Sequence, residues 1–183
     1  MITASVKKRE NIAEYLLYMW QIEDLIRANK LDIDKIQETI INNYRDITEE
    51  QKKEMRDWYE SLIDMMRREG VQEKGHLQIN KNVIISLEDL HRRLLGDQKF
   101  ASYTSQFYHT LPIIVELRAK SGEEKSGEIE TCFNALYGIL LLRLQGKEIS
   151  KDTLEATSQI SKFLAVLAMY YKKDYNNELF TES

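Results

Sequence analysis

Residues 135–144 read Ala-Leu-Tyr-Gly-Ile-Leu-Leu-Leu-Arg-Leu and form the most apolar stretch of the chain. A helix that is apolar on every side must be covered by neighbours on every side, so we expect residues 128–145 to form the central helix of the fold. The stretch is too short to cross a membrane, which takes about 20 residues, and it contains Arg143. It therefore predicts a buried helix and no membrane partner.

The chain of 183 residues contains one proline and seven glycines, so little interrupts its helices. Elsewhere, as over residues 12–26, apolar residues recur at steps of three and four, which is typical of one helix face. We therefore predict an all-α fold: a single domain over 1–183, built as a bundle of six or seven mostly antiparallel helices.

Capping residues and helix breakers predict where these helices begin and end. Asp32, Ser150 and the capping box Thr48-Glu-Glu-Gln51 are expected N-termini, and Gly70 is an expected C-terminal stop. Pro112 either kinks a helix or begins a new one. The expected helices cover about 6–29, 33–44, 49–69, 83–95, 98–120, 128–145 and 151–174.

Three segments are expected to lie outside helices. Residues 71–82 are the least helical, with a short extended piece at 76–79, and 121–127 form a loop. Residues 176–183 are expected to be a frayed tail.

Composition narrows the class of protein. The net charge is −4 and the short basic clusters are scattered, so a nucleic-acid partner is disfavoured. Cys132 is the only cysteine, which excludes a disulfide within the chain and fits a reducing compartment. The first residues carry charges instead of an apolar signal segment, so we expect a cytoplasmic protein.

Glu88-Asp-Leu-His91 places a carboxylate and an imidazole on one helix face, as in helical di-iron sites. Such sites need a second pair and two further glutamates. The only other Glu-x-x-His, Glu73 to His76, contains a glycine and lies in the least helical segment. We therefore expect no metal and no cofactor.

The segment 98–120 carries aromatic residues together with His109 and Glu116, which could line a small-molecule pocket with histidine as a general base. Aromatic core packing explains the same residues. Cys132 stands beside Phe133 in an apolar pattern, where a thiol is normally inert, and common nucleotide and hydrolase motifs are absent. The candidate pocket residues are Glu88, His91, Tyr103, Tyr108, His109 and Glu116.

Gly75-His-Leu-Gln-Ile-Asn-Lys-Asn82 and Leu111-Pro-Ile-Ile-Val-Glu-Leu117, with the overall length, resemble a family of Bacteroidetes proteins described only as a domain of unknown function. The resemblance implies an all-helical cytoplasmic protein and assigns no functional residue.

We predict a non-catalytic helical interaction or scaffold protein, with a second copy or another protein as its partner. The alternative is a small-molecule- or metal-binding helical protein, or an enzyme, with a site near 83–95 and 98–120.

Overall fold

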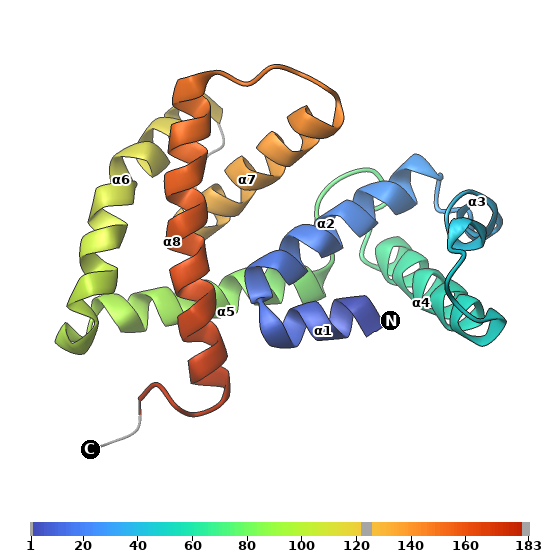
Figure 1. Cartoon of the computed structure of the whole chain (residues 1–183), viewed down its shortest axis with the longest axis horizontal. Coiled ribbons are helices and arrows are strands. Elements are labelled where there is room, and N and C mark those ends of the chain that lie inside the picture. Colours follow the sequence, from blue (N-terminus) through green and yellow to red (C-terminus); the bar gives the residue numbers. More distant parts are fainter. Residues whose placement is uncertain (1, 122–125, 181–183) are drawn as a thin grey trace. The chain divides into compact units, whose positions relative to one another are not determined.

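The structure is a computed structural model, and it describes residues 2–121 and 126–180. The described residues form eight α-helices and two short 3₁₀ helices, with no strand, which confirms the all-α class (Figure 1). The elements are α1 (Ile2–Glu10), α2 (Ile12–Ala28), α3 (Ile33–Thr39), η1 (Ile41–Asn43), α4 (Glu49–Arg68), α5 (Gln78–Leu95), η2 (Gln98–Phe100), α6 (Ala101–Ser121), α7 (Glu128–Leu144) and α8 (Lys151–Tyr175).

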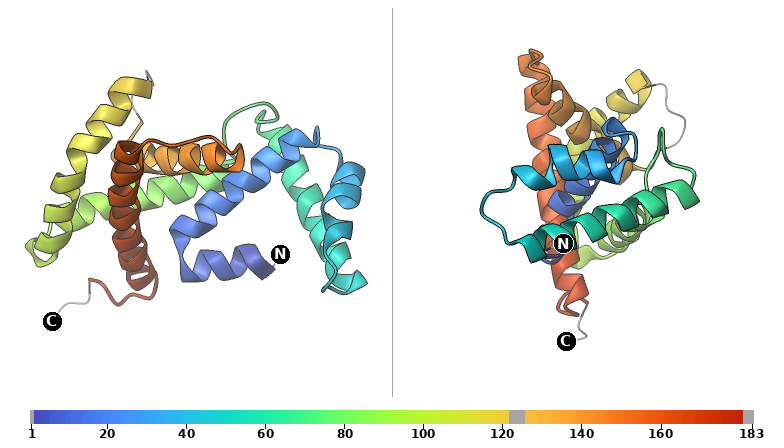
Figure 2. Two further views of the ribbon diagram at one scale, coloured as in Figure 1. Left: turned by 45° about the horizontal axis from the view of Figure 1, so that its top comes forward. Right: turned by 90° about the vertical axis from the view of Figure 1, so that its right-hand side faces the viewer.

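The chain divides into two compact units. The first comprises residues 1–10 and 14–82, and the second comprises residues 11–13 and 83–183. In the first unit α3 lies alongside α4 (Figure 2). Its buried side chains come mainly from α2 and α4 at helical spacing, and include Leu16, Met19, Ile26, Tyr59, Leu62, Ile63 and Met66.

In the second unit α8 crosses α7 and lies beside α6, and α6 also packs on α7 (Figure 1). Ile129, Cys132 and Phe133, near the start of α7, are completely buried. Its last turns are covered less well, and Leu144 is 70% exposed. None of the described helices combines the length and the apolar character that crossing a bilayer requires.

The predicted caps are confirmed. The Asp32 side chain accepts from the backbone N–H of Asp34 and Lys35, and the Ser150 hydroxyl accepts from Thr153 N–H. Thr48 and Gln51 satisfy each other's backbone N–H groups, at 2.9 and 3.2 Å. Gly70 has φ +70°, the left-handed conformation expected of a helix stop.

The helix predicted over 6–29 is instead two helices, α1 and α2. The Asn11 side chain accepts a hydrogen bond from Ala13 N–H at 3.1 Å and so acts as the N-cap of α2. Asparagine favours this position because its short side chain replaces a missing backbone acceptor. Asn11, a polar residue inside the predicted helix, is therefore the start of α2.

Two further differences concern α5 and α6. Helix α5 begins at Gln78 and not at residue 83, because the Glu69 carboxylate accepts from Gln78 N–H at 2.6 Å. The extended piece predicted at 76–79 is therefore wrong. Pro112 neither ends α6 nor begins a new helix, since α6 continues through it from Ala101 to Ser121.

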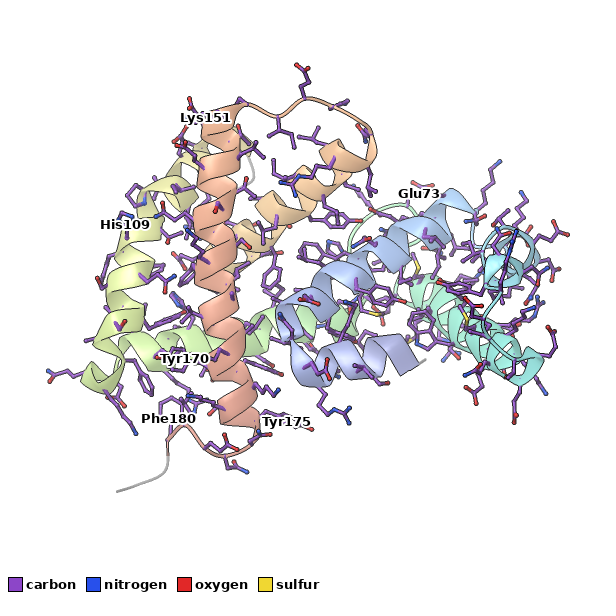
Figure 3. All side chains as sticks on the ribbon, in the orientation of Figure 1. Glu73, His109, Lys151, Tyr170, Tyr175 and Phe180 are labelled. Carbon is purple, nitrogen blue, oxygen red and sulfur yellow. The ribbon has the colours of Figure 1, made fainter. Side chains whose placement is uncertain are left out.

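The frayed tail predicted from residue 176 is wrong for residues 176–180. Leu179 is only 5% exposed, and the Phe180 ring contacts the Phe100 ring at 5.5 Å. The Arg93 guanidinium lies 4.1 Å from the centre of the Phe180 ring, at the end of α8 (Figure 3). Residues 181–183, and most of the predicted loop at 121–127, lie outside the described residues.

Candidate functional site

His91 and Tyr103 come together in the core of the second unit. His91 Nδ1 lies 2.6 Å from the Tyr103 hydroxyl, and the rings of Phe107 and Phe163 pack edge-on against the imidazole. Burial lowers the pKa of His91 to about 4, so the imidazole is neutral at pH 7. His91 is 4% exposed and Tyr103 1%, so this pair acts as a hydrogen-bonded core contact.

Glu88, one turn before His91 on α5, lies against the N-terminus of α7. Gly127, the N-cap residue, offers no side-chain acceptor, and the Glu88 carboxylate fills the space that a Cβ at position 127 would take. Burial raises the pKa of the Glu88 carboxyl, and a hydrogen bond from the Glu130 backbone opposes that rise. Glu88 therefore serves as the cap that Gly127 lacks.

Tyr108, His109 and Glu116 are all exposed on α6, and Figure 3 shows His109 on this helix. Tyr108 is 61% exposed. The His109 backbone carbonyl accepts from Gln159 Nε2 at 2.7 Å, and Glu116 forms an ion pair with Lys120 at 2.5 Å. The hydrogen bond from Lys120 lowers the pKa of Glu116. The structure therefore does not bring these three residues together with His91 and Tyr103.

Among the described residues, helices of the second unit line two cavities that bear on a candidate site. A small one of about 360 Å³ lies between α6 and α8, with His109 and Lys162 in its wall. The larger one, which we call the three-helix groove, has a volume of about 660 Å³ and is lined by α6, α7, α8 and the segment joining α7 to α8. Its wall includes Ile113, Glu116, Leu117, Ile139, Leu142 and Ile160.

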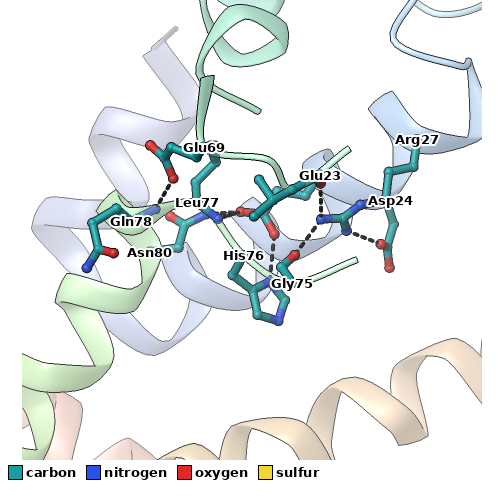
Figure 4. Close-up of polar contacts among 10 residues, drawn as sticks. Glu23, Asp24, Arg27, Glu69, Gly75, His76, Leu77, Gln78 and Asn80 are labelled. Atoms are coloured by element: carbon teal, nitrogen blue, oxygen red, sulfur yellow. Dashed lines mark hydrogen bonds and ion pairs between the residues drawn. The ribbon is translucent and has the colours of Figure 1, made fainter. Parts of the chain in front are cut away.

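The first unit contains a buried polar cluster around Glu23, which was not predicted from the sequence. Glu23, on α2, is completely buried, and Figure 4 shows its polar contacts. Its carboxylate accepts from Leu77 N–H at 2.9 Å and from Asn80 Nδ2 at 2.7 Å, and its second oxygen lies 2.6 Å from His76 Nδ1. The His76 ring stacks on Trp20, with ring centres 4.2 Å apart.

Arg27, one turn after Glu23, holds the segment before α5. Its guanidinium donates to the carbonyls of Val71, at 3.1 Å, and Gly75, and pairs with Asp24 at 2.7 Å. Residues 71–80 are therefore held against α2 through backbone and side-chain contacts. In the sequence, the feature that could have indicated this cluster is Glu23, a carboxylate between Ile22 and Ile26 on an apolar helix face.

Chemically, Glu23 fixes the orientation of His76 by accepting the Nδ1 proton, which leaves Nε2 as the free ring nitrogen. A partly exposed imidazole held in this way can accept or donate a proton. No group of three or more His, Cys, Asp or Glu side chains suited to a metal occurs among residues 2–121 and 126–180. Cys132 is buried, and burial raises the pKa of its thiol to about 12, so the thiol is unreactive at pH 7.

These features define an all-α helical-bundle protein with a buried polar cluster between α2 and the start of α5 and with two cavities that α6 and α8 help to line. The chain belongs to the family described as Domain of unknown function (DUF4924), whose model matches residues 1–178. No curated protein and no solved structure matches the chain.

Proposed function

We propose that the protein is a non-catalytic helical interaction protein of the cytoplasm and that it pairs with a second copy of itself through α6. The observation that carries this proposal is an uncharged line of residues on the exposed side of α6, which we call the α6 stripe. All of its members are exposed, Tyr108 by 61% and Val115 by 56%. The α6 stripe consists of Ala101, Ser105, Tyr108, Pro112, Val115 and Ala119.

The exposed face of α4 differs from the α6 stripe in its charge. The solvent side of α4 presents Lys53, Glu54, Asp57, Glu60 and Asp64. By contrast, residues 101–115 contain no Asp, Glu, Lys or Arg. An exposed helix face without charge, carrying a tyrosine and a valine, is typical of a surface that is covered by a partner.

The spacing of the α6 stripe favours a second copy as that partner. Its members are separated by alternating steps of four and three, the repeat of helix–helix seams. The series reads the same in both directions, so an antiparallel copy presents matching positions, as a twofold interface requires. In that pairing Ala101 meets Ala119, Ser105 meets Val115 and Tyr108 meets Pro112. Small residues at both ends allow close approach, and no charge has to be buried.

Sedimentation velocity on the full chain tests the proposal. We expect a dimer that dissociates when Tyr108→Lys and Val115→Glu are introduced together, because both place charge in the seam. Met169→Lys is the matched control, since Met169 is a 45% exposed apolar residue on α8. A native chain that is monomeric at all accessible concentrations, or a dimer indifferent to both stripe substitutions, would refute the proposal.

The second candidate function is small-molecule binding. It is favoured by the three-helix groove, whose volume of about 660 Å³ lies within the usual range for small-molecule sites. The groove uses α6 residues 113, 116, 117 and 120, which are not members of the α6 stripe. Ligand binding and self-association can therefore be tested separately.

A further inference from the structure

The three-helix groove has an apolar interior that the side chains of the protein do not fill. Ile139 and Ile160 are buried in its wall, and Ile113, Leu117 and Leu142 line it as partly exposed residues. Gly138 lies in the same wall, and a Cβ built there would meet nothing within 4 Å. Glycine inside a helix costs about 1 kcal/mol relative to alanine, so its presence in α7 enlarges the groove at the expense of helix stability.

The shape of the groove favours a small molecule over a partner helix. Its α6 wall runs from Ile113 to Lys120, about 10 Å of helix, and its α8 wall runs from Asp152 to Ile160, about 12 Å. Gln145 and Lys147, on the segment that joins α7 to α8, also line it. A helix is itself about 10 Å across, so a space of this size, walled by three helices and a connection, suits a shorter and thinner occupant.

The charges around the groove favour an anionic head group. Glu116 and Lys120 neutralise each other in an ion pair. Asp152 lies in the first turn of α8, where the helix N-terminus offsets its negative charge. Lys147 has no ion pair with any of the residues that the structure describes, so its ammonium group is the one that a ligand can neutralise.

From the apolar wall, the space beside Gly138 and the free ammonium of Lys147, we infer that the three-helix groove binds a medium-length amphipathic carboxylate, such as a free fatty acid. The hydrocarbon chain lies against Ile113, Ile139 and Ile160. The carboxylate pairs with Lys147. This site is independent of self-association through the α6 stripe.

Isothermal titration calorimetry with decanoate, below its micelle-forming concentration, tests the inference on the full chain. We expect one decanoate per chain, and binding at least about tenfold weaker after Lys147→Gln, as loss of a charge-assisted hydrogen bond predicts. Decanol, which has the same hydrocarbon chain without the charge, should bind weakly and be indifferent to Lys147→Gln. Equal binding of decanol and decanoate would overturn the assignment of an anionic head group.

Gly138 provides the steric test. Gly138→Leu should abolish binding by filling the groove, whereas Gly138→Ala should retain it. Ala165→Leu makes a matched change at an exposed position on α8 and should leave binding unchanged. If Gly138→Leu binds decanoate as the native chain does, the groove is not the site.

Isoleucine methyl spectra of the native chain give a readout that does not depend on variant folding. Decanoate should shift the methyl resonances of Ile113, Ile139 and Ile160, in the groove, and leave those of Ile36 and Ile63, in the first unit, in place. Shifts spread over both sets, or found only in the first unit, would overturn the inference.

Discussion

The Glu23 carboxylate lies 2.6 Å from Nδ1 of His76, and the two residues are 53 positions apart in the chain. Because Glu23 is completely buried, each hydrogen bond it accepts replaces one that water would have supplied. Its partners all lie between residues 76 and 80, where the chain enters α5. The cluster therefore anchors the start of α5 to α2.

Glu23→Gln should destabilise the protein substantially. The amide keeps the shape of the side chain but replaces one carboxylate oxygen with an NH₂ donor, so His76 must change tautomer to accept from it, and the remaining hydrogen bonds lose the charge of the carboxylate. We expect a loss of about 2–3 kcal/mol in the free energy of unfolding, measured by urea denaturation. Glu54→Gln, the same change at an exposed position on α4, is the control and should cost less than about 0.5 kcal/mol. Equal costs at the two positions would contradict the anchoring role of Glu23.

Two substitutions of His76 separate its hydrogen bond from its stacking. His76→Asn can still donate to Glu23 but loses the stack on Trp20, whereas His76→Phe keeps the stack and leaves a Glu23 oxygen unpaired. We expect His76→Phe to be the more destabilising by about 1–2 kcal/mol in urea denaturation, because an unpaired buried carboxylate oxygen costs more than a lost ring contact. The opposite order would assign the main contribution of His76 to stacking.

The low pKa of His91 makes stability depend on pH. The folded protein holds His91 neutral down to about pH 4, whereas the unfolded chain protonates it near pH 6.5. Between these values the unfolded state binds more protons, so stability falls as the pH falls from about 6.5 towards 4. In His91→Phe this contribution is missing. The stability of the native chain relative to His91→Phe should therefore decrease by about 2 kcal/mol between pH 7 and pH 5.

Urea denaturation of both proteins at several pH values measures this difference, and His109→Phe, at an exposed position on α6, is the control. A difference between the native chain and His91→Phe that stays constant from pH 7 to pH 5 would show that His91 is not held neutral by the fold.

Local signals predicted much of the fold. The caps at Asp32, Thr48 and Ser150 were predictable because each depends on residues within three positions in the chain. The start of α5 was not, since its N–H groups are satisfied by Glu69 and Glu23, which belong to other helices. Contacts of this kind depend on tertiary packing, which spacing along one helix does not encode.

The candidate site residues show the same limit. Spacing places Glu88 and His91 on one side of α5, yet Glu88 caps α7 whereas His91 bonds to Tyr103. The α6 residues Tyr108, His109 and Glu116 share a helix with Tyr103 but face solvent. The sequence supplied the residue types, and the packing of α6, α7 and α8 decided which of them meet.

Glycine-to-alanine substitutions at positions 127 and 138 should have effects of opposite sign. At Gly127 the new methyl group collides with the Glu88 carboxylate, so we expect a loss of about 1–3 kcal/mol. At Gly138 it meets nothing within 4 Å and removes the entropic cost of a helical glycine, so we expect a gain of about 1 kcal/mol. A double-mutant cycle in urea identifies the cause: in a Glu88→Ala background, where the colliding group is gone, Gly127→Ala should lose most of its cost. A cost that persists unchanged in that background would mean that position 127 requires glycine for a reason other than the approach of Glu88.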